Sequence, residues 1–218
     1  TPLYSSAASD VYKRQLPYCP KDQTPLSAHE LRMDADVYQN RQDTTVSVAV
    51  KLRDEADAYA VFWTTTPWTV PTNFAIVVGA DIDYVEVRPT EGKFAGKKFY
   101  IGKPLLGSYT KELGENYEVV RELKGAEMAG WRYYPVFPYF ASDSALAEGG
   151  TPGPNAFTIF TADYVDTAEG TGLVHQAPYG EDDMNTLNAH EIRSVDVLDA
   201  GCKFTSDCPD YELSLIHI

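Results

Sequence analysis

Cysteine is scarce in this chain, since its 218 residues contain only Cys19, Cys202 and Cys208. No two of them form a Cys-x-x-Cys pair, and three cysteines do not make a paired framework. The pattern argues against a small disulfide-stabilised scaffold and predicts a reducing compartment, the cytoplasm. The spacing of His175, His190 and the cysteines matches no zinc pattern, so we predict no metal site.

Basic residues are also few. The chain has 18 lysines and arginines against 32 aspartates and glutamates, for a formal net charge of -14 at pH 7. A domain that holds nucleic acid through phosphate contacts needs a basic face. The composition therefore argues against a free-standing nucleic-acid-binding domain, and any RNA contact must borrow basic surface from elsewhere.

Long apolar runs are missing as well. No stretch approaches the roughly 18 uninterrupted apolar residues of a membrane helix, and the first residues lack a secretory pattern. We therefore expect no membrane partner. The chain does contain 44% apolar and 12% aromatic residues, enough for the core of one domain or two small ones.

The two ends of the chain carry complementary coding signatures. Residues 10–15, DVYKRQ, can be encoded by GATGTGTATAAGAGACAG, and the reverse complement of that sequence encodes LSLIHI, which is residues 213–218. Such a pair is typical of a sequencing-library adapter translated in both directions. We predict that residues 1–15 and 213–218 are not natural protein, and we set them aside.

The hydrophobic pattern predicts a mostly-β domain. Residues 16–45 are polar and rich in proline, which indicates a connector, and residues 46–52 then alternate apolar and polar side chains as a half-buried strand does. Further short β-like runs cover residues 58–64, 74–78, 84–88, 98–101, 117–123, 157–162 and 173–176.

Short strands at this spacing favour a barrel-like antiparallel sheet with short peripheral helices, an α+β fold that is mostly β. The clearest helix covers residues 181–191, with acids in its first turn and Met184 and Leu187 on one side. Residues 142–155 look like an exposed loop. We place the domain at residues 46–200 and an exit connector at residues 201–212.

The stretch WTTTPWTVPTN, residues 63–73, places Thr64, Thr65 and Thr66 where a predicted strand ends. β-Branched threonine suits a strand, and Pro67 and Pro71 would end it, so a purely structural role is open. Loops at the ends of rigid strands also build sites. Threonine hydroxyls both donate and accept hydrogen bonds, so they can hold a ribose, an ester carbonyl or a water molecule.

The stretch GTGLVHQAPYGEDD, residues 170–183, lacks the third glycine and the long helix of a dinucleotide-binding motif. His175 in it fits a buried core histidine or a site residue. Asp182 and Asp183 fit ordinary helix-start acids. The same helix end would also keep a carboxylate ionised, and an ionised carboxylate suits a substrate ammonium group.

Both stretches resemble the two signature segments of the editing domain inserted into the catalytic domain of isoleucyl-tRNA synthetases. The likeness extends to PYCPKDQTPLSAHELR, ELKGAEMAGWRYYPVFPYF and VDVLDAGCKFTSDCPDYE, so it covers nearly all of residues 16–212. Leucyl and valyl editing domains resemble each other in having Thr-Thr-Arg-Pro where this chain has Thr-Thr-Thr-Pro-Trp. The isoleucyl family therefore leads, with a valyl or leucyl editing domain as an alternative.

The resemblance implies a pocket that receives the 3′ end of mischarged tRNA(Ile) and hydrolyses the valyl ester with water, without a cofactor. Thr64, Thr65 and Thr66 would position the terminal adenosine, the ester or the water, and Asp183 would hold the α-ammonium group. Further substrate-binding residues implied by the likeness are Asn73 as support, His175 as the wall that admits valine and refuses isoleucine, Trp68, Gly172 and Asp182.

Two departures from the family qualify these expectations. The loop between His175 and Gly180 is one residue shorter than expected, which leaves Asp182 as an alternative to Asp183. No His-x-Gly-His or KMSKS-like stretch occurs, so ATP and Mg would belong to the catalytic domain of the parent chain, which would be a further partner. A different class remains open: a noncatalytic acidic β-rich module that binds a protein or small ligand. Such a module would leave the threonine run and Asp183 far apart.

Overall fold

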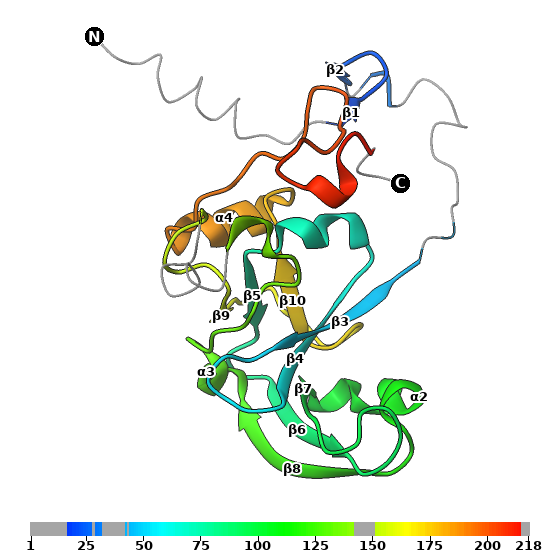
Figure 1. Ribbon diagram of the computed structural model, residues 1–218, viewed down its shortest axis with the longest axis vertical. Helices are drawn as coiled ribbons and strands as arrows, with labels where there is room; N and C mark the ends of the chain where they lie inside the picture. The colour runs from blue at the N-terminus through cyan, green and yellow to red at the C-terminus, as the bar shows by residue number, and fades with distance from the viewer. Residues whose placement is uncertain (1–16, 28, 32–41, 43, 142–150, 215–218) are drawn as a thin grey trace. The chain divides into compact units, whose positions relative to one another are not determined.

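The computed structural model describes residues 17–27, 29–31, 42, 44–141 and 151–214 (Figure 1). It divides into two compact units, one of residues 43–196 and one of the flanking residues up to 42 and from 197 onward. Most of the exposed loop predicted at residues 142–155 lies outside the described residues. So do residues 1–15 and 215–218, and the prediction that both ends are not natural protein stays untested.

The flanking unit joins the two predicted connectors. Strands β1 (Tyr18–Cys19) and β2 (Thr24–Pro25) form an antiparallel pair, and the short helix η5 (Pro209–Tyr211) lies near the other end of the chain. The Tyr18 hydroxyl donates to the carbonyl of Ala200 at 3.0 Å. The segments before and after the central domain therefore contact each other.

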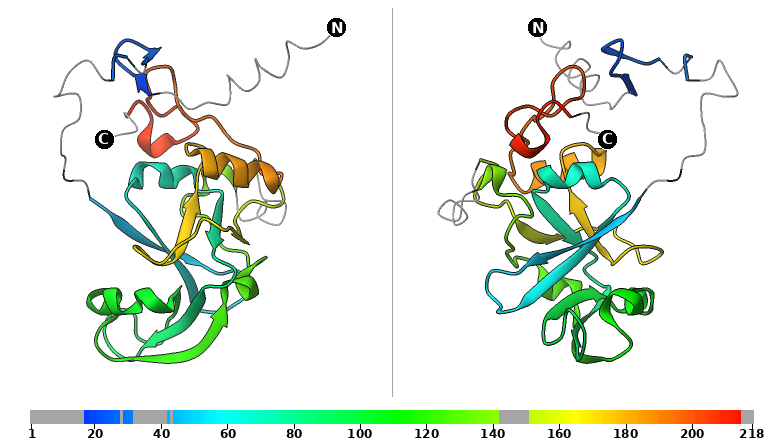
Figure 2. Two further views of the ribbon diagram at one scale, coloured as in Figure 1. Left: turned by 180° about the vertical axis from the view of Figure 1, so that it is seen from behind. Right: turned by 45° about the vertical axis from the view of Figure 1, so that its right-hand side comes forward.

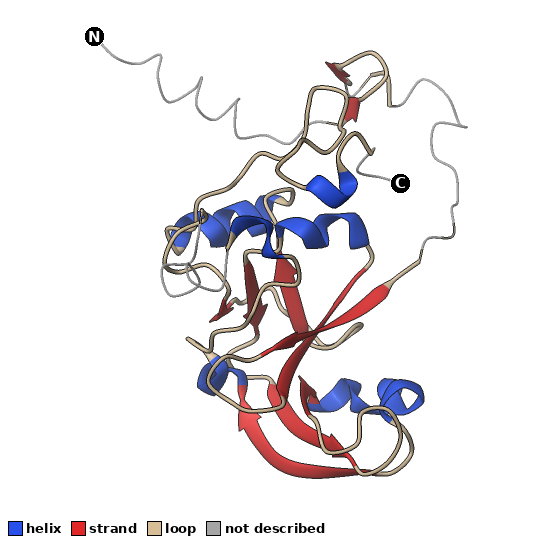
Figure 3. Cartoon of the chain, in the orientation of Figure 1, coloured by secondary structure: helices blue, strands red, loops and turns tan. Residues whose placement is uncertain are grey.

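The larger unit is built on one eight-stranded sheet among the described residues, drawn in red in Figure 3. Its strands follow the order β8-β6-β7-β4-β10-β5-β9, and β3 pairs with β4 along the other edge of β4. The strands are β3 (Val46–Lys51), β4 (Ala58–Thr64), β5 (Ala75–Val78), β6 (Asp83–Pro89), β7 (Lys98–Gly102), β8 (Tyr117–Lys124), β9 (Thr158–Thr161) and β10 (Leu173–Gln176). Each strand predicted from the sequence is present, so the mostly-β fold is confirmed.

The sheet is mixed, however, and not antiparallel throughout. β4 runs parallel to β7 and to β10, and β5 runs parallel to β9. The sequence shows where strands begin and end, but not which strands become neighbours. Here β4 pairs with strands that follow much later in the chain, and such long connections permit parallel pairing.

Short helices lie around the sheet, as predicted. They are η1 (Pro67–Thr72), η2 (Lys103–Tyr109), α2 (Thr110–Leu113), α3 (Gly125–Met128), η3 (Pro138–Phe140) and α4 (Glu181–Ala189). The helix expected at residues 181–191 is thus confirmed over most of its length, with Leu187 fully buried. No helix among the described residues is both long and apolar enough to cross a membrane.

Candidate functional site

Three strand ends meet at one edge of the sheet. Val174 of β10 lies opposite Trp63 of the parallel strand β4, so both strands end at this edge. Gln176 of β10 lies opposite Ala75 of the antiparallel strand β5, so β5 begins there. The helix η1 follows β4, and α4 follows β10; both lie over this edge in Figures 1 and 2. The topology therefore brings together the two stretches that the sequence singled out.

The threonines form a hydrogen-bonded cluster where β4 ends. The backbone N–H of Thr66 donates to Thr64 Oγ1 at 3.0 Å, and the two hydroxyl oxygens are also 3.0 Å apart. The Thr69 hydroxyl donates to the Thr66 carbonyl at 2.7 Å, which closes the first turn of η1. Thr65 is exposed between them. Alternation along the strand end thus buries Thr64 and turns Thr65 toward solvent.

His175 ties this cluster to β10. Its Nε2 lies 2.8 Å from Thr69 Oγ1, and its ring stacks on Phe62 of β4 with ring centroids 5.2 Å apart. Burial lowers the pKa of His175 to about 4, so the imidazole is neutral at pH 7. The ring therefore holds the threonine turn against the sheet, and its role in selecting the substrate side chain stays a prediction.

Asn73, between the end of η1 and the start of β5, contacts the same histidine. Its Nδ2 lies 3.2 Å from His175 Nδ1 and donates to the Ala75 carbonyl at 2.9 Å. The Tyr133 hydroxyl donates to Asn73 Oδ1 at 2.6 Å. Asn73 thus links His175 to Tyr133, and its part in supporting a substrate site stays a prediction.

Asp183 lies in the first turn of α4, where it is half-buried, whereas Asp182 is exposed. We expected the helix end to keep the Asp183 carboxylate ionised, but burial dominates and raises its pKa to about 6. Hydrogen bonds from the backbone at Ala177 and Gly180 only partly offset this. The carboxylate is still largely ionised at pH 7.5, and its partial burial distinguishes it from Asp182 as a partner for an ammonium group.

Two tyrosines make further contacts at this edge, and the sequence did not single them out. The Thr72 hydroxyl of η1 donates to Tyr179 Oη in the loop before α4 at 3.3 Å. The Tyr164 hydroxyl donates to Gln176 Oε1 at 2.8 Å and lies 3.0 Å from Thr186 Oγ1 of α4. Burial, reinforced by the charges of Asp183 and Asp182, raises the pKa of Tyr164. Isolated tyrosines in loops give no periodic signal, so only the structure identifies them.

Gly180 makes room for the Asp183 carboxylate. A Cβ atom added to Gly180 would lie 2.0 Å from Asp183 Oδ2, well inside van der Waals contact. We expect Gly180→Ala to displace the carboxylate and to lower the hydrolytic activity proposed below by about tenfold, because misplacement of a binding group by about 1 Å costs up to about 100-fold. Gly107→Ala is the matched control, since nothing lies within 4 Å of a Cβ there. Equal deacylation rates for the two variants would contradict this role.

Trp68 and Gly172, two other residues predicted to bind substrate, lie at different ends of the sheet region described here: Trp68 at this edge and Gly172 at the opposite end of β10. Trp68 is half-buried in η1, two residues after Thr66. Gly172 precedes β10 and so lies at the opposite end of that strand from Gln176, and its carbonyl accepts the Tyr84 hydroxyl at 2.6 Å. The structure therefore gives Gly172 a structural partner, and its part in substrate binding stays a prediction.

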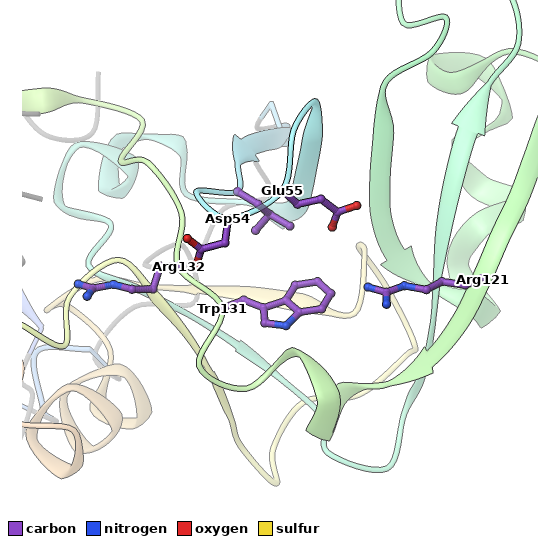
Figure 4. A pocket seen from close by; sticks show the side chains of 6 residues that line it. Asp54, Glu55, Arg121, Trp131 and Arg132 are labelled. Carbon is purple, nitrogen blue, oxygen red and sulfur yellow. The ribbon is translucent and has the colours of Figure 1, made fainter. Parts of the chain in front are cut away.

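A cavity of about 310 Å³ lies at the other end of β4, near the turn between β3 and β4 (Figure 4). Asp54, Glu55, Arg121, Trp131 and Arg132 line it with Leu52. Glu55 accepts hydrogen bonds from Lys98 at 2.6 Å and Tyr100 at 2.7 Å, and Arg121 donates to the Tyr100 hydroxyl at 3.1 Å. Glu55 and Arg121 therefore already have protein partners, which gives their side of the cavity the character of a structural polar network. Among the described residues, no group of three or more histidine, cysteine, aspartate or glutamate side chains is arranged to hold a metal ion.

No family model matches the chain. It is 80% identical to the isoleucine–tRNA ligase of Bifidobacterium longum (strain NCC 2705) over 210 residues, which covers 96% of this chain and 19% of that relative. It is 44% identical to the isoleucine–tRNA ligase of Mycobacterium tuberculosis (strain ATCC 25618 / H37Rv) over 206 residues, or 91% of this chain and 18% of the relative. The chain thus spans about a fifth of the length of these relatives.

Among solved structures, the crystal structure of GlLeuRS-CP1 aligns with 66% of this chain and 58% of its own, at 12% identity and a TM-score of 0.47. The Plasmodium falciparum cytosolic leucyl-tRNA synthetase editing domain (space group P21) aligns with 55% of this chain and 41% of its own, at 12% identity and a TM-score of 0.40. Sequence identity carries the assignment: with 80% of aligned residues shared over nearly its whole length, the chain belongs to the isoleucyl-tRNA synthetase family.

Proposed function

We propose that this chain carries an editing site that hydrolyses the aminoacyl ester of valine mistakenly attached to tRNA(Ile). The threonine wall of Thr64, Thr65 and Thr66 binds the terminal adenosine and the ester and orients a water molecule. Asp183 binds the α-ammonium group of the aminoacyl moiety. Water is the nucleophile, so no protein group becomes acylated and no cofactor takes part in the hydrolysis.

The observation that carries this proposal is that the threonine stretch adjoins the stretch that leads to Asp183. Thr69 bonds His175 across the β4 and β10 strand ends, and Thr72 bonds Tyr179 in the loop that leads to Asp183. Hydroxyls from one stretch and a carboxylate from the other therefore belong to one edge of the sheet. A noncatalytic acidic module would not require these two stretches to adjoin.

The chemistry of each wall suits an aminoacyl ester. A fixed carboxylate that holds the ammonium group sets the ester carbonyl at a repeatable distance from the hydroxyl wall, and such positioning contributes several kcal/mol to the lowering of a barrier. Hydroxyl and backbone donors near the carbonyl stabilise the oxyanion that develops as water attacks. Neutral His175 adds no competing positive charge for Asp183 to bind.

Size selects the substrate in this proposal. Isoleucine exceeds valine by one methylene, which a single hydrophobic pocket distinguishes by only about 10–200-fold. A second site that accepts only the smaller amino acid removes the errors of the first. The rigid wall of His175, stacked on Phe62 and bonded on both ring nitrogens, is suited to excluding a methylene.

The rest of the parent chain supplies what this segment does not contain. By family membership we assign to it the charging of tRNA(Ile) with isoleucine in the cytoplasm, with ATP and Mg, and most of the grip on the tRNA. The net charge of -14 gives this segment little electrostatic hold on RNA. The isolated chain is therefore expected to deacylate tRNA only at high protein concentration and low salt.

The test is deacylation of tRNA(Ile) charged with valine and, separately, with isoleucine, by the 218-residue chain in excess at low ionic strength. We expect the valyl ester to be hydrolysed faster than its spontaneous rate and at least about tenfold faster than the isoleucyl ester, in line with the cost of one methylene. Equal rates for the two esters, or rates equal to those without protein, would contradict the proposal.

A further inference from the structure

The amide of Asn73 has a fixed orientation. The Ala75 carbonyl can only accept a hydrogen bond, so the Asn73 group 2.9 Å from it is the amide nitrogen. The Asn73 oxygen then faces the Tyr133 hydroxyl, which donates to it at 2.6 Å. Tyr133 is fully buried, which leaves its hydroxyl few alternative partners. Asn73 and Tyr133 therefore hold each other in one arrangement.

This orientation determines which nitrogen of His175 carries the proton. The second N–H of the Asn73 amide points to His175 Nδ1 at 3.2 Å, so Nδ1 must accept and carries no proton. A neutral imidazole then has its proton on Nε2, which donates to Thr69 Oγ1 at 2.8 Å. With the opposite tautomer, two N–H groups would face each other at Nδ1.

The histidine in turn sets the direction of the threonine hydroxyls. Thr69 Oγ1 accepts from His175 and gives its own proton to the Thr66 carbonyl at 2.7 Å. In the contact of 3.4 Å between the Thr66 and Thr69 hydroxyls, Thr66 is therefore the donor. Thr64 then donates to Thr66 at 3.0 Å. The lone pairs of Thr64 and Thr66 that remain are acceptors for a water or ribose hydroxyl.

We propose that Tyr133 and Asn73 are positioning residues that fix His175 as the Nε2–H tautomer and thereby set the direction of the hydroxyl chain of the threonine wall. Neither residue needs to touch the substrate for this. The tautomer itself does not depend on what the site hydrolyses. Only the kinetic consequence rests on the proposed editing function, so the two claims can fail separately.

The direct test is ¹⁵N NMR of the 218-residue chain labelled at its four histidines, with His175→Gln to assign the signals. In the unsubstituted chain we expect the His175 proton on Nε2, and a proton on Nδ1 would overturn the proposal. Asn73→Asp places an acceptor oxygen beside Nδ1 without changing the size of the side chain. We expect it to move the proton to Nδ1; an unchanged tautomer in a folded variant would equally overturn the proposal.

Tyr133→Phe tests the same chain of contacts with less risk to folding. It removes only the hydroxyl that holds Asn73 Oδ1, so we expect the Nδ1–H form to become detectable. Tyr109→Phe is the matched control, because Tyr109 is also buried but its hydroxyl contacts Ser47. If the His175 signals of Tyr133→Phe equal those of Tyr109→Phe, Tyr133 has no part in fixing the tautomer.

Deacylation kinetics then link the tautomer to the site. We expect kcat/KM for valyl-tRNA to fall about tenfold in Asn73→Asp and less in Tyr133→Phe, in proportion to the Nδ1–H population. A changed tautomer with unchanged kcat/KM would refute the control of the threonine wall. Absence of deacylation in the unsubstituted chain would count against the proposed function alone, since the NMR result stands without it.

Discussion

Replacing Asp183 with alanine is expected to lower kcat/KM for hydrolysis of valyl-tRNA(Ile) by about 30-fold or more. Loss of one partner of a buried, hydrogen-bonded charge pair costs about 2–5 kcal/mol, and each 1.4 kcal/mol is a factor of ten. Asp183 is the half-buried acid at the start of α4, and backbone groups of the preceding loop orient it. Without it, nothing in the proposed site fixes the ammonium end of the substrate.

Asp182→Ala is the matched control for this prediction. The two aspartates are adjacent in the same helical turn and carry the same charge, but Asp182 is exposed. We expect its replacement to change kcat/KM by less than about threefold, the scale of a surface charge. If Asp182→Ala were the more damaging substitution, the shorter loop would have shifted the anchor by one residue.

The pH dependence of the same activity provides a second measure of Asp183. Because burial raises its pKa to about 6, kcat/KM in the free protein should rise with pH, reach half of its maximum at about pH 6 and level off about one unit above that. The protonated carboxyl is neutral and no longer attracts an ammonium group. In Asp183→Asn the acidic limb should disappear, once the spontaneous hydrolysis of the ester is subtracted at each pH.

The sequence predicted the strands well because their signal is local. Alternation at Val46–Lys51 and the apolar runs at Ala58–Thr64 and Ala75–Val78 reflect which faces are buried, and each is a strand in the structure. Pairing is not local. The parallel neighbours β4 and β10 are separated by more than a hundred residues, so no periodicity within either strand reports their contact.

Prediction of the site followed the same rule. Thr64 and Thr66 were identifiable because they cluster in the sequence, and they do bond each other. The contacts that organise them come from Tyr133 and Tyr179, single residues in distant loops. Burial also opposed a local effect: the helix end favours an ionised Asp183, but removal from water raises the pKa of its carboxyl to about 6, and the carboxylate stays largely ionised only above that pH.

The threonine wall and the wall formed by Asp183 at the start of α4, the acidic wall, therefore differ in how well their polar groups are satisfied within the protein. The threonine wall is internally satisfied, since His175, Thr69 and Thr66 bond one another and leave acceptors for a ligand. The acidic wall carries a carboxylate whose charged form is poorly compensated within the protein. A substrate ammonium group would supply the positive charge that the Asp183 carboxylate lacks within the protein. The contribution of Asp183 to the stability of the folded chain should therefore depend on pH and on bound ligand.

Replacing Asp183 with asparagine should accordingly stabilise the folded chain at neutral pH, by up to about 3 kcal/mol. Folding raises the pKa of Asp183 from 3.8 to about 6, so the folded state binds this proton more tightly than the unfolded chain. The stability from that proton is fully present below pH 3.8 and is lost as the pH rises through 6. Asparagine keeps the size and the hydrogen-bond acceptor of the side chain but carries no charge to bury.

Urea unfolding at several pH values would measure this effect, with Asp182→Asn as the exposed control. His175 has the opposite slope, because folding lowers its pKa from 6.5 to about 4 and stability is lost as the pH falls through that range. In the unsubstituted chain these two opposite pH dependences offset each other. In Asp183→Asn only the His175 dependence remains, so the free energy of unfolding should increase as the pH rises from 4 to 6.5. A loss of stability at pH 7 would show that the charge helps to hold the fold. A gain, together with lost hydrolysis, would mark Asp183 as a residue kept at a cost in stability for its interaction with substrate.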